Sequence, residues 1–237
     1  EIAQCLVGSE MCIRDSGKRC ICFNKKAIDL IYKDSNLKNI TADENFDTFS
    51  LSWYNNTDVD PATGLTPYIN MQKVLKVCHD FVDNFDNTFS NLLFIGQTGV
   101  GKTFLSNCIA RALMDSCHSI IYLTAGEFFD SFKSDDFKEF GSSKFDTSFF
   151  VECDLLIIDD LGTEKASDYN FSNLFNTINE RLLRRKSIII SSNLEMPDIE
   201  TRYSQRIFSR LVSAYSILRL FGDDIRCMKK LSPTKRS

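Results

Sequence analysis

The sequence predicts an α/β fold in which helices cover both faces of a central five-stranded parallel sheet. From residue 91 onwards, short apolar runs alternate with segments of helical periodicity, as in parallel strands joined by crossover helices. Polar or glycine-rich residues follow several of these runs, where ligands bind in such sheets. The expected strands lie at residues 91–95, 119–123, 153–160, 187–193 and 213–220.

Helix signals fill the gaps between these strands. Thr66 and Pro67 predict a helix start, a cap residue and then proline at the first helical position, and this helix should run to about residue 84. Thr124 and Glu127 have the spacing of a capping box. Further helices are expected at 104–113 and 171–182, with a final helical turn at 222–226. A helix opened by Pro197 should carry three arginines on one face, Arg202, Arg206 and Arg210, for which a solvated basic face is the alternative.

The N-terminal third divides into three pieces. Residues 1–16 resemble translated sequencing-adapter sequence and are set aside as non-native. Residues 17–40 are interpreted as the remnant of a cysteine-containing N-terminal appendage, with a short helix within 23–40, and residues 41–66 as a polar linker. The aromatic residues of this linker either pack onto the following domain, the favoured use, or stack on bases. The main domain should span residues 67–230, followed by a tail at 231–237.

Two cysteines in the appendage have the spacing of a zinc half-site. Cys20 and Cys22 would need further ligands, and the nearby Cys5 and Cys12 both lie in the segment set aside. Two free thiols are the alternative interpretation.

Composition excludes several classes of protein. With 43% hydrophobic and 25% charged residues, the chain is typical of a soluble globular protein. Its apolar runs are too short to span a bilayer and its start lacks a signal peptide pattern, so a cytoplasmic protein without a membrane partner is expected.

The net charge of −4 gives no support for nucleic-acid binding overall. A local basic run begins at Arg226, although a solvated tail explains that run equally simply.

A phosphate-binding turn follows the first expected strand. Residues 96–103 fit the pattern G-x-x-x-x-G-K-[ST], in which backbone N–H groups and a helix N-terminus cradle phosphates. Lys102 should reach the β- and γ-phosphates of ATP, and Thr103 should bind Mg²⁺. The residues expected to contact nucleotide are Gly96, Gln97, Thr98, Gly99, Val100, Gly101, Lys102, Thr103 and Phe104.

Two further strands end in residues that suit the same chemistry. The run at 153–158 ends in Asp159 and Asp160, of which the first can hold Mg²⁺ and the second can orient the attacking water. Taken alone this pattern is common, but downstream of a phosphate-binding turn it is specific. Asn193 ends the next strand and would lie beside the γ-phosphate if that strand neighbours the first one.

These motifs resemble, in type and order, those of AAA+ ATPases and in particular the DnaC/IstB family. The resemblance rests on residues 96–103, 159–164, 190–193 and 206–211, and it covers about residues 67–230. Residues 18–26 and 45–49 are similar to the N-terminal region of the DnaC/DnaI-type members. The resemblance implies a P-loop AAA+ fold with Lys102 and Thr103 as the Walker A pair and Asp159 and Asp160 as Walker B. It also implies that Asn193 is sensor 1, Arg226 is sensor 2 and Arg210 is an arginine finger acting on ATP of a neighbouring subunit.

The family resemblance also implies a function. We expect an ATP- and Mg²⁺-dependent helicase loader that self-associates through its ATP site and engages a replicative helicase and single-stranded DNA. Many AAA+ proteins have Glu at the position of Asp160, so the shorter acid bears on the rate of hydrolysis. Because the arginine finger would come from a neighbouring subunit, hydrolysis should be slow without assembly. A transposase helper ATPase of the same family is the alternative. A small-molecule P-loop kinase and a nucleotide-binding scaffold without turnover are minor alternatives.

Overall fold

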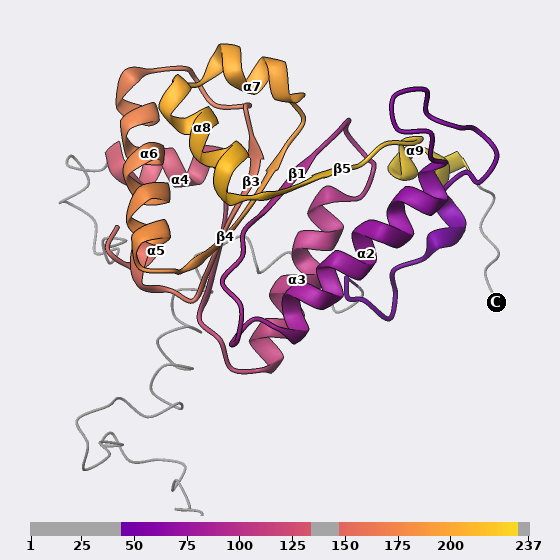
Figure 1. Cartoon of the computed structure of the whole chain (residues 1–237), viewed down its shortest axis with the longest axis horizontal. Helices are drawn as coiled ribbons and strands as arrows, with labels where there is room; N and C mark the ends of the chain where they lie inside the picture. Colours follow the sequence, from indigo (N-terminus) through magenta and orange to yellow (C-terminus); the bar gives the residue numbers. More distant parts are fainter. Residues whose placement is uncertain (1–43, 134–146, 232–237) are drawn as a thin grey trace, which may run out of the picture.

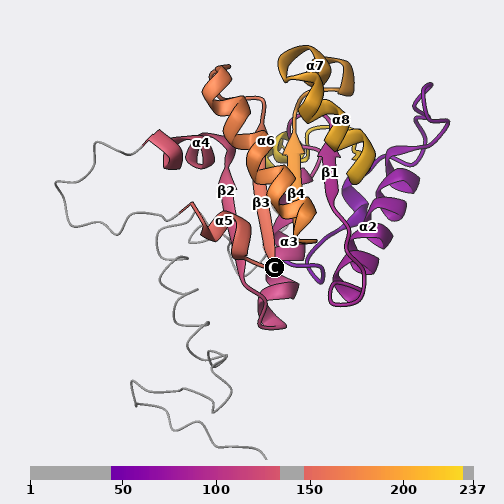
Figure 2. The same cartoon turned by 60° about the vertical axis from the view of Figure 1, so that its left-hand side comes forward.

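The computed structural model describes residues 44–133 and 147–231 and contains one five-stranded parallel sheet (Figure 1). The strand order is β2-β3-β4-β1-β5, and Figure 2 shows β2, β3, β4 and β1 side by side in this order. The predicted α/β fold with a five-stranded parallel sheet is confirmed. The strands are β1 (Leu92–Ile95), β2 (Ile120–Thr124), β3 (Leu155–Leu161), β4 (Ser187–Ser192) and β5 (Ser216–Arg219).

Helices form a layer on each face of this sheet. One layer contains α2 (Pro67–Asp83) and α3 (Lys102–Asp115), with the short η2 (Leu51–Trp53) and α9 (Ile225–Leu231) at its edge (Figure 1). The opposite layer contains α4 (Ala125–Lys133), α5 (Phe149–Glu152), α6 (Asp168–Leu183), α7 (Met196–Arg202) and α8 (Gln205–Ala214).

Alternate strand residues supply the two cores. Leu93 and Ile158 pack under the α4–α8 layer, whereas Leu92 and Ile157 pack under α2 and α3. Because both faces of the sheet are covered, β1 to β4 contain continuous apolar runs, whereas the edge strand β5 is partly exposed.

The strand order places the predicted site residues at one edge of the sheet. β4 pairs with β1, with Ile95 opposite Ser192, so Asn193 follows directly beside the phosphate-binding turn. The neighbouring strand β3 ends at the same edge with Asp159 and Asp160. The strand that precedes Asn193 therefore neighbours the strand of the phosphate-binding turn, which was the condition for placing Asn193 beside the γ-phosphate.

The predicted arginine-bearing helix is two helices, and the expectation of three arginines on one face was wrong. Tyr203 is extended (φ −101°, ψ 161°), and the Ser204 side chain caps α8 by accepting from the backbone N–H of Ile207. A serine or threonine side chain that satisfies a free N–H starts a helix rather than continuing one. Arg202 therefore ends α7 and pairs with Glu164, while Arg206 and Arg210 lie on α8.

Two other boundaries differ from expectation, whereas two helix starts agree. The helix α8 extends to Ala214, so the last strand begins at Ser216 rather than at residue 213. The helical turn expected at 222–226 begins three residues later, at Ile225, and continues to Leu231 as α9. The α2 start agrees, since the Thr66 hydroxyl accepts from the N–H of Ile69, and Thr124 and Glu127 make the reciprocal bonds of a capping box.

Residues 44–54, here named the aromatic strap, pack against α2, α3 and the phosphate-binding turn. Tyr54 is buried, Phe49 contacts the ring of Phe104, and Phe46 stacks on His79. Packing of this segment onto the main domain, the favoured interpretation, is what the structure shows. The expectations for residues 1–43, including the helix within 23–40 and the half-site of Cys20 and Cys22, lie outside the described residues, as does nearly all of the tail.

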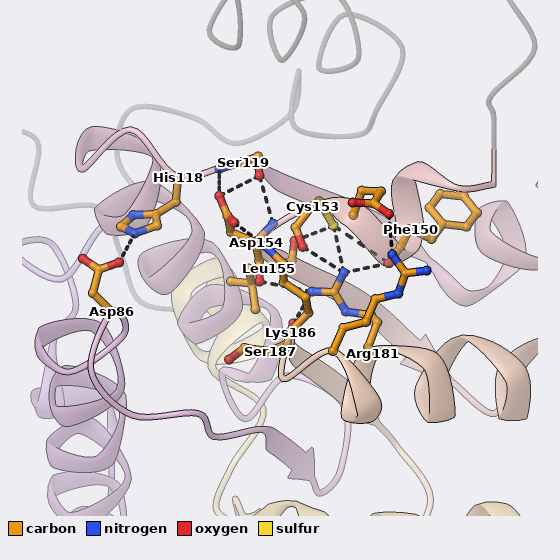
Figure 3. Close-up of polar contacts among 12 residues, drawn as sticks. Asp86, His118, Ser119, Phe150, Cys153, Asp154, Leu155, Arg181, Lys186 and Ser187 are labelled. Carbon is orange, nitrogen blue, oxygen red and sulfur yellow. Dashed lines mark hydrogen bonds and ion pairs between the residues drawn. The ribbon is translucent and has the colours of Figure 1, made fainter. Parts of the chain in front are cut away.

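A buried arginine joins the elements at the opposite end of the sheet (Figure 3). Arg181 of α6 is fully buried, and its guanidinium donates to backbone carbonyls of Phe150, Cys153, Asp154 and Ser187 at 2.6–3.1 Å. These carbonyls belong to α5, to the start of β3 and to the start of β4. The Arg181 side chain thus holds together the segments that lead into β3 and β4. The opposite ends of these two strands carry the candidate site residues Asp159, Asp160 and Asn193.

Within residues 44–133 and 147–231, no helix combines the length and apolar character needed to cross a membrane.

Candidate nucleotide site

The phosphate-binding turn connects β1 to α3 and depends on glycine geometry. Gly96 has φ 144°, and a Cβ there would lie 2.0 Å from the carbonyl oxygen of Leu220. Gly101 has φ 105°, and a Cβ there would lie 2.6 Å from the Tyr54 hydroxyl. Only glycine combines these φ values with such close approaches, so the backbone can curl and present its N–H groups inward.

Lys102, the first residue of α3, is held by three oxygen atoms. Its Nζ lies 2.7 Å from the Gly96 carbonyl, 2.8 Å from the Gln97 carbonyl and 2.7 Å from Oδ1 of Asn193. An ammonium has three donors, so all of them are used. Burial lowers the pKa of Lys102, although the carboxylates of Asp160 and Asp159 oppose this effect. A phosphate bound in the cavity would therefore have to replace at least one of these contacts to receive a hydrogen bond from Lys102.

Asp159 is buried and fully engaged by hydroxyl groups. Its carboxylate accepts from Thr103 at 3.0 Å, from Tyr122 at 2.9 Å and from Ser191. A hydroxyl and a carboxylate oxygen side by side form a donor set that suits Mg²⁺, which usually takes one or two protein ligands plus phosphates and water. In the described part of the chain no group of three or more acidic, histidine or cysteine side chains could hold a metal alone. The residues present therefore fit a magnesium ion that a nucleotide brings with it.

Asp160 faces a different environment although it is adjacent in sequence. Its φ of 57° and the irregular register between Ile158 and Leu161 turn it away from Asp159. Its carboxylate accepts from Nδ2 of Asn193 at 3.3 Å, and its own N–H donates to the Ser191 hydroxyl at 2.9 Å. Burial, and then the charge of Asp159, raise the pKa of the Asp160 carboxyl above its ordinary value. Asp adopts the left-handed conformation more readily than most residues, and here this conformation separates the directions of two consecutive carboxylates.

These groups surround a cavity of about 530 Å³, a volume typical of small-molecule sites. Most of the sequence-predicted residues line it, whereas Gly96, Gln97, Val100 and the buried Asp159 do not. The predicted residues at the wall are Thr98, Gly99, Gly101, Lys102, Thr103, Phe104, Asp160, Asn193 and Arg226.

Arg226 and Arg210 are separated by the fold. Arg226 lies on α9, which is fixed to the turn because the backbone N–H of Ile225 donates to the Gly99 carbonyl at 3.1 Å. Arg210 on α8 is exposed and lies outside this cavity, and its guanidinium donates to Oδ1 of Asn179 at 3.4 Å. The fold therefore does not bring Arg210 to the nucleotide cavity of its own chain.

Sequence reasoning missed one whole wall of the cavity. Two segments outside the sheet provide it, the aromatic strap and α9. The cluster of aromatic residues in an otherwise polar stretch was the available signal, because such residues need apolar surroundings. The missed residues are Glu44, Thr48, Phe49, Ser50, Trp53, Tyr54, Ile225 and Lys229.

In the strand order β4 lies between the turn-bearing β1 and the acid-bearing β3, and the chain is an α/β protein of the P-loop class. Its family follows from the sequence. The model of the IstB-like ATP binding proteins matches residues 69–232, well over half of the chain, and the chain belongs to that family.

Individual relatives agree with this assignment. The replicative helicase loader DnaC of Escherichia coli strain K12 is 23% identical over 151 residues, which cover 63% of this chain and 61% of the relative. The chain thus spans about three fifths of the length of such relatives. A crystal structure of the DnaC helicase loader superposes with a TM-score of 0.58 at 21% identity, covering 73% of this chain and 96% of that one. AMPPCP-bound DnaA from Aquifex aeolicus gives 0.60 at 18% identity, covering 84% and 58%. The likeness to these two solved structures shows the fold.

Proposed function

We propose that this protein is a helicase loader, a cytoplasmic ATPase that assembles on single-stranded DNA and engages a replicative helicase. The family and the similarity to DnaC support the loader interpretation. The observation that carries the assembly step is geometric. The cavity gathers phosphate-binding and water-orienting groups, whereas Arg210 lies on a different surface.

In this proposal the chain's residues divide the work of hydrolysis. The turn and Lys102 bind the β- and γ-phosphates, and Asn193 holds Lys102 on one side and Asp160 on the other. Asp160 orients the attacking water and accepts its proton. Arg226 lines the cavity beside these groups and adds positive charge there.

Thr103 and Asp159 would hold Mg²⁺. The ion would neutralise charge on the β- and γ-phosphate oxygens as hydrolysis proceeds. Tyr122 and Ser191 fix the orientation of the Asp159 carboxylate by donating hydrogen bonds to it.

Arg210 would act in trans. An arginine finger contributes about 10³ to 10⁵ in rate, so an isolated subunit should hydrolyse ATP slowly and an assembly quickly. ATP binding would favour assembly, and hydrolysis would release the helicase.

The decisive experiment measures phosphate release by the full chain with single-stranded DNA, duplex DNA or no DNA, each with and without the replicative helicase of the same organism. Stimulation by single-stranded DNA together with ATP-dependent capture of the helicase is expected. The Lys102→Ala variant is the control for contaminating ATPase activity. Capture that does not depend on ATP would contradict the proposal.

The transposase-helper alternative predicts a different result in the same assay. Its activity should be stimulated by duplex DNA, and the helicase should have no effect. The family model covers both kinds of protein, so this contrast decides between them. The kinase alternative gains no support from the comparisons.

A further inference from the structure

We propose that Glu164 is a positioning residue for ATP hydrolysis, which holds the loop after Asp160 against the junction between α7 and α8. Glu164 lies outside the nucleotide cavity and acts through Asp160, which lines that cavity. The inference rests on the proposed role of Asp160 in orienting the attacking water. It does not depend on helicase loading or on Arg210.

The Glu164 carboxylate is buried and joins two segments of the chain. Its side chain is only 3% exposed, so its oxygen atoms need donors from the protein. Oε2 accepts from the backbone N–H of Gly162 at 2.8 Å. Oε1 accepts from the Tyr203 hydroxyl at 2.5 Å and lies 3.5 Å from Nε of Arg202. One oxygen thus holds the loop and the other holds the end of α7, and we name Glu164, Arg202 and Tyr203 the loop clamp.

The loop between Asp160 and Glu164 carries this restraint to the cavity. Gly162, with φ 109°, reverses the chain direction and is the residue that Glu164 holds. The next residue, Thr163, donates to the Asp160 carbonyl through its hydroxyl at 2.9 Å and its backbone N–H at 3.4 Å. A displacement of Glu164 would therefore shift the backbone that keeps Asp160 in its left-handed conformation.

The other side of the loop clamp is anchored in the helical layer. Tyr203 is buried, and its ring meets that of Phe171 on α6 edge to face, with centroids 5.3 Å apart. Burial and then the hydrogen bond to Glu164 raise the pKa of Tyr203, so its hydroxyl stays protonated and donates. The Arg202 guanidinium also donates to the backbone carbonyl of Glu164. The position of Asp160 thus depends on packed helices as well as on its own loop.

Tyr203→Phe tests the loop clamp because it removes one hydroxyl and keeps the ring. Single-turnover hydrolysis by the full chain should slow about 10- to 100-fold, since small displacements of a reacting group are costly, whereas the Kd for ATP should not change. The matched control is Tyr215→Phe at the other end of α8. Its hydroxyl is also buried but has no hydrogen-bond partner among the described residues, so hydrolysis should be unaffected. A Tyr203→Phe variant as fast as this control would overturn the proposal.

A double substitution separates positioning from general support of the fold. In the Asp160→Asn background the carboxylate to be positioned is absent, so adding Tyr203→Phe should change the residual rate by less than about 2-fold. The rate of Lys102→Ala is subtracted as background, and circular dichroism checks that each variant is folded at the assay temperature. An equal fold-loss in both backgrounds would mean that Tyr203 only supports the structure, which contradicts positioning.

Glu164→Gln tests the remaining part of the loop clamp. Glutamine keeps the side-chain length but presents an NH₂ group in place of one oxygen, so Gly162 or Tyr203 loses its acceptor. Hydrolysis should slow with ATP binding retained, and combining this change with Tyr203→Phe should cost no more than the larger single effect. Additive losses would contradict a single clamp.

The Asp160→Asn variant alone shows which inference fails. If it loses hydrolysis while both clamp variants keep it, the loop clamp is overturned and the role of Asp160 stands. If it hydrolyses ATP at the normal rate, the role of Asp160 is overturned and positioning by Glu164 with it.

Discussion

At the scale of single residues, two consecutive aspartates have different tasks because the backbone separates them. Asp159 continues the strand and is enclosed by three hydroxyl groups. Asp160 adopts a left-handed conformation and faces the cavity with Asn193. The first is therefore suited to holding a cation and the second to handling a proton.

Replacing Asp160 with Asn should abolish most hydrolysis while leaving nucleotide binding intact. Asn tolerates the left-handed conformation and keeps the side-chain volume, so the fold should be unchanged. Loss of a general base lowers rates by about 10² to 10⁴. Single-turnover hydrolysis and equilibrium binding of ATP measure the two quantities separately. A variant that loses binding and hydrolysis equally would contradict the proposed role.

The raised pKa of Asp160 should appear in the pH dependence of hydrolysis. The carboxylate takes up a proton at a higher pH than an ordinary Asp, so the rate should begin to fall earlier on acidification. The same raised pKa affects folding stability in the opposite direction, so that acidification favours the folded state. A group with a raised folded pKa contributes stability below its unfolded pKa, and this contribution is lost as pH rises through the folded pKa. The pH–rate profile should therefore lose its acid limb in Asp160→Asn, and circular dichroism should show the native protein still folded within that limb.

At the scale of elements, Arg181 joins α6 to the entries of β3 and β4. Four carbonyl groups accept from its guanidinium, and its position on the buried face of α6, three residues after Ile178, was a sequence signal that it points inward. An arginine is rarely found in a protein interior unless hydrogen-bond acceptors pair with its N–H groups.

Arg181→Met should destabilise the protein by at least about 3 kcal/mol, because it leaves buried carbonyls without donors. Arg184→Met, at the C-cap of the same helix, is the matched control. Arg184 is half-exposed and pairs with Glu152 and Glu180, so its loss should cost no more than about 1 kcal/mol. Urea denaturation of both variants measures the free energy of unfolding. Equal effects would mean that the buried contacts carry no special weight.

At the scale of the whole molecule, the separation of Arg210 from the cavity predicts complementation between inactive subunits. Lys102→Ala should remove phosphate binding and Arg210→Ala should remove the proposed arginine finger, so each variant alone should be nearly inactive. In mixed assemblies the intact Arg210 of one subunit can serve the intact site of the other, and part of the activity should return. Phosphate release at varying mixing ratios measures this effect. Arg206→Ala, one helical turn away on α8, is the control and should retain activity.

Some features of this protein were predictable from its sequence, and others became evident only in the tertiary structure. The sequence alone determined the fold class, the sheet of five parallel strands and the phosphate-binding turn, because apolar periodicity and glycine spacing are local properties. Asp159, Asp160 and Asn193 were predictable for the same reason, since each ends an apolar run whose direction in a parallel sheet is known.

Only the tertiary structure decided the rest. The helix expected to carry the three arginines is interrupted at Tyr203 and Ser204, because the Ser204 side chain caps a new helix. The helical spacing of the arginines gave no sign of this cap. The aromatic wall depends on contacts such as Tyr54 with Val100, 46 residues apart in sequence. Such contacts form because apolar burial and hydrogen bonding stabilise them in the folded chain. No local sequence pattern predicts which distant residues will meet. The phosphate half of the site was therefore visible in the sequence, whereas the half that adjoins it was visible only in the fold.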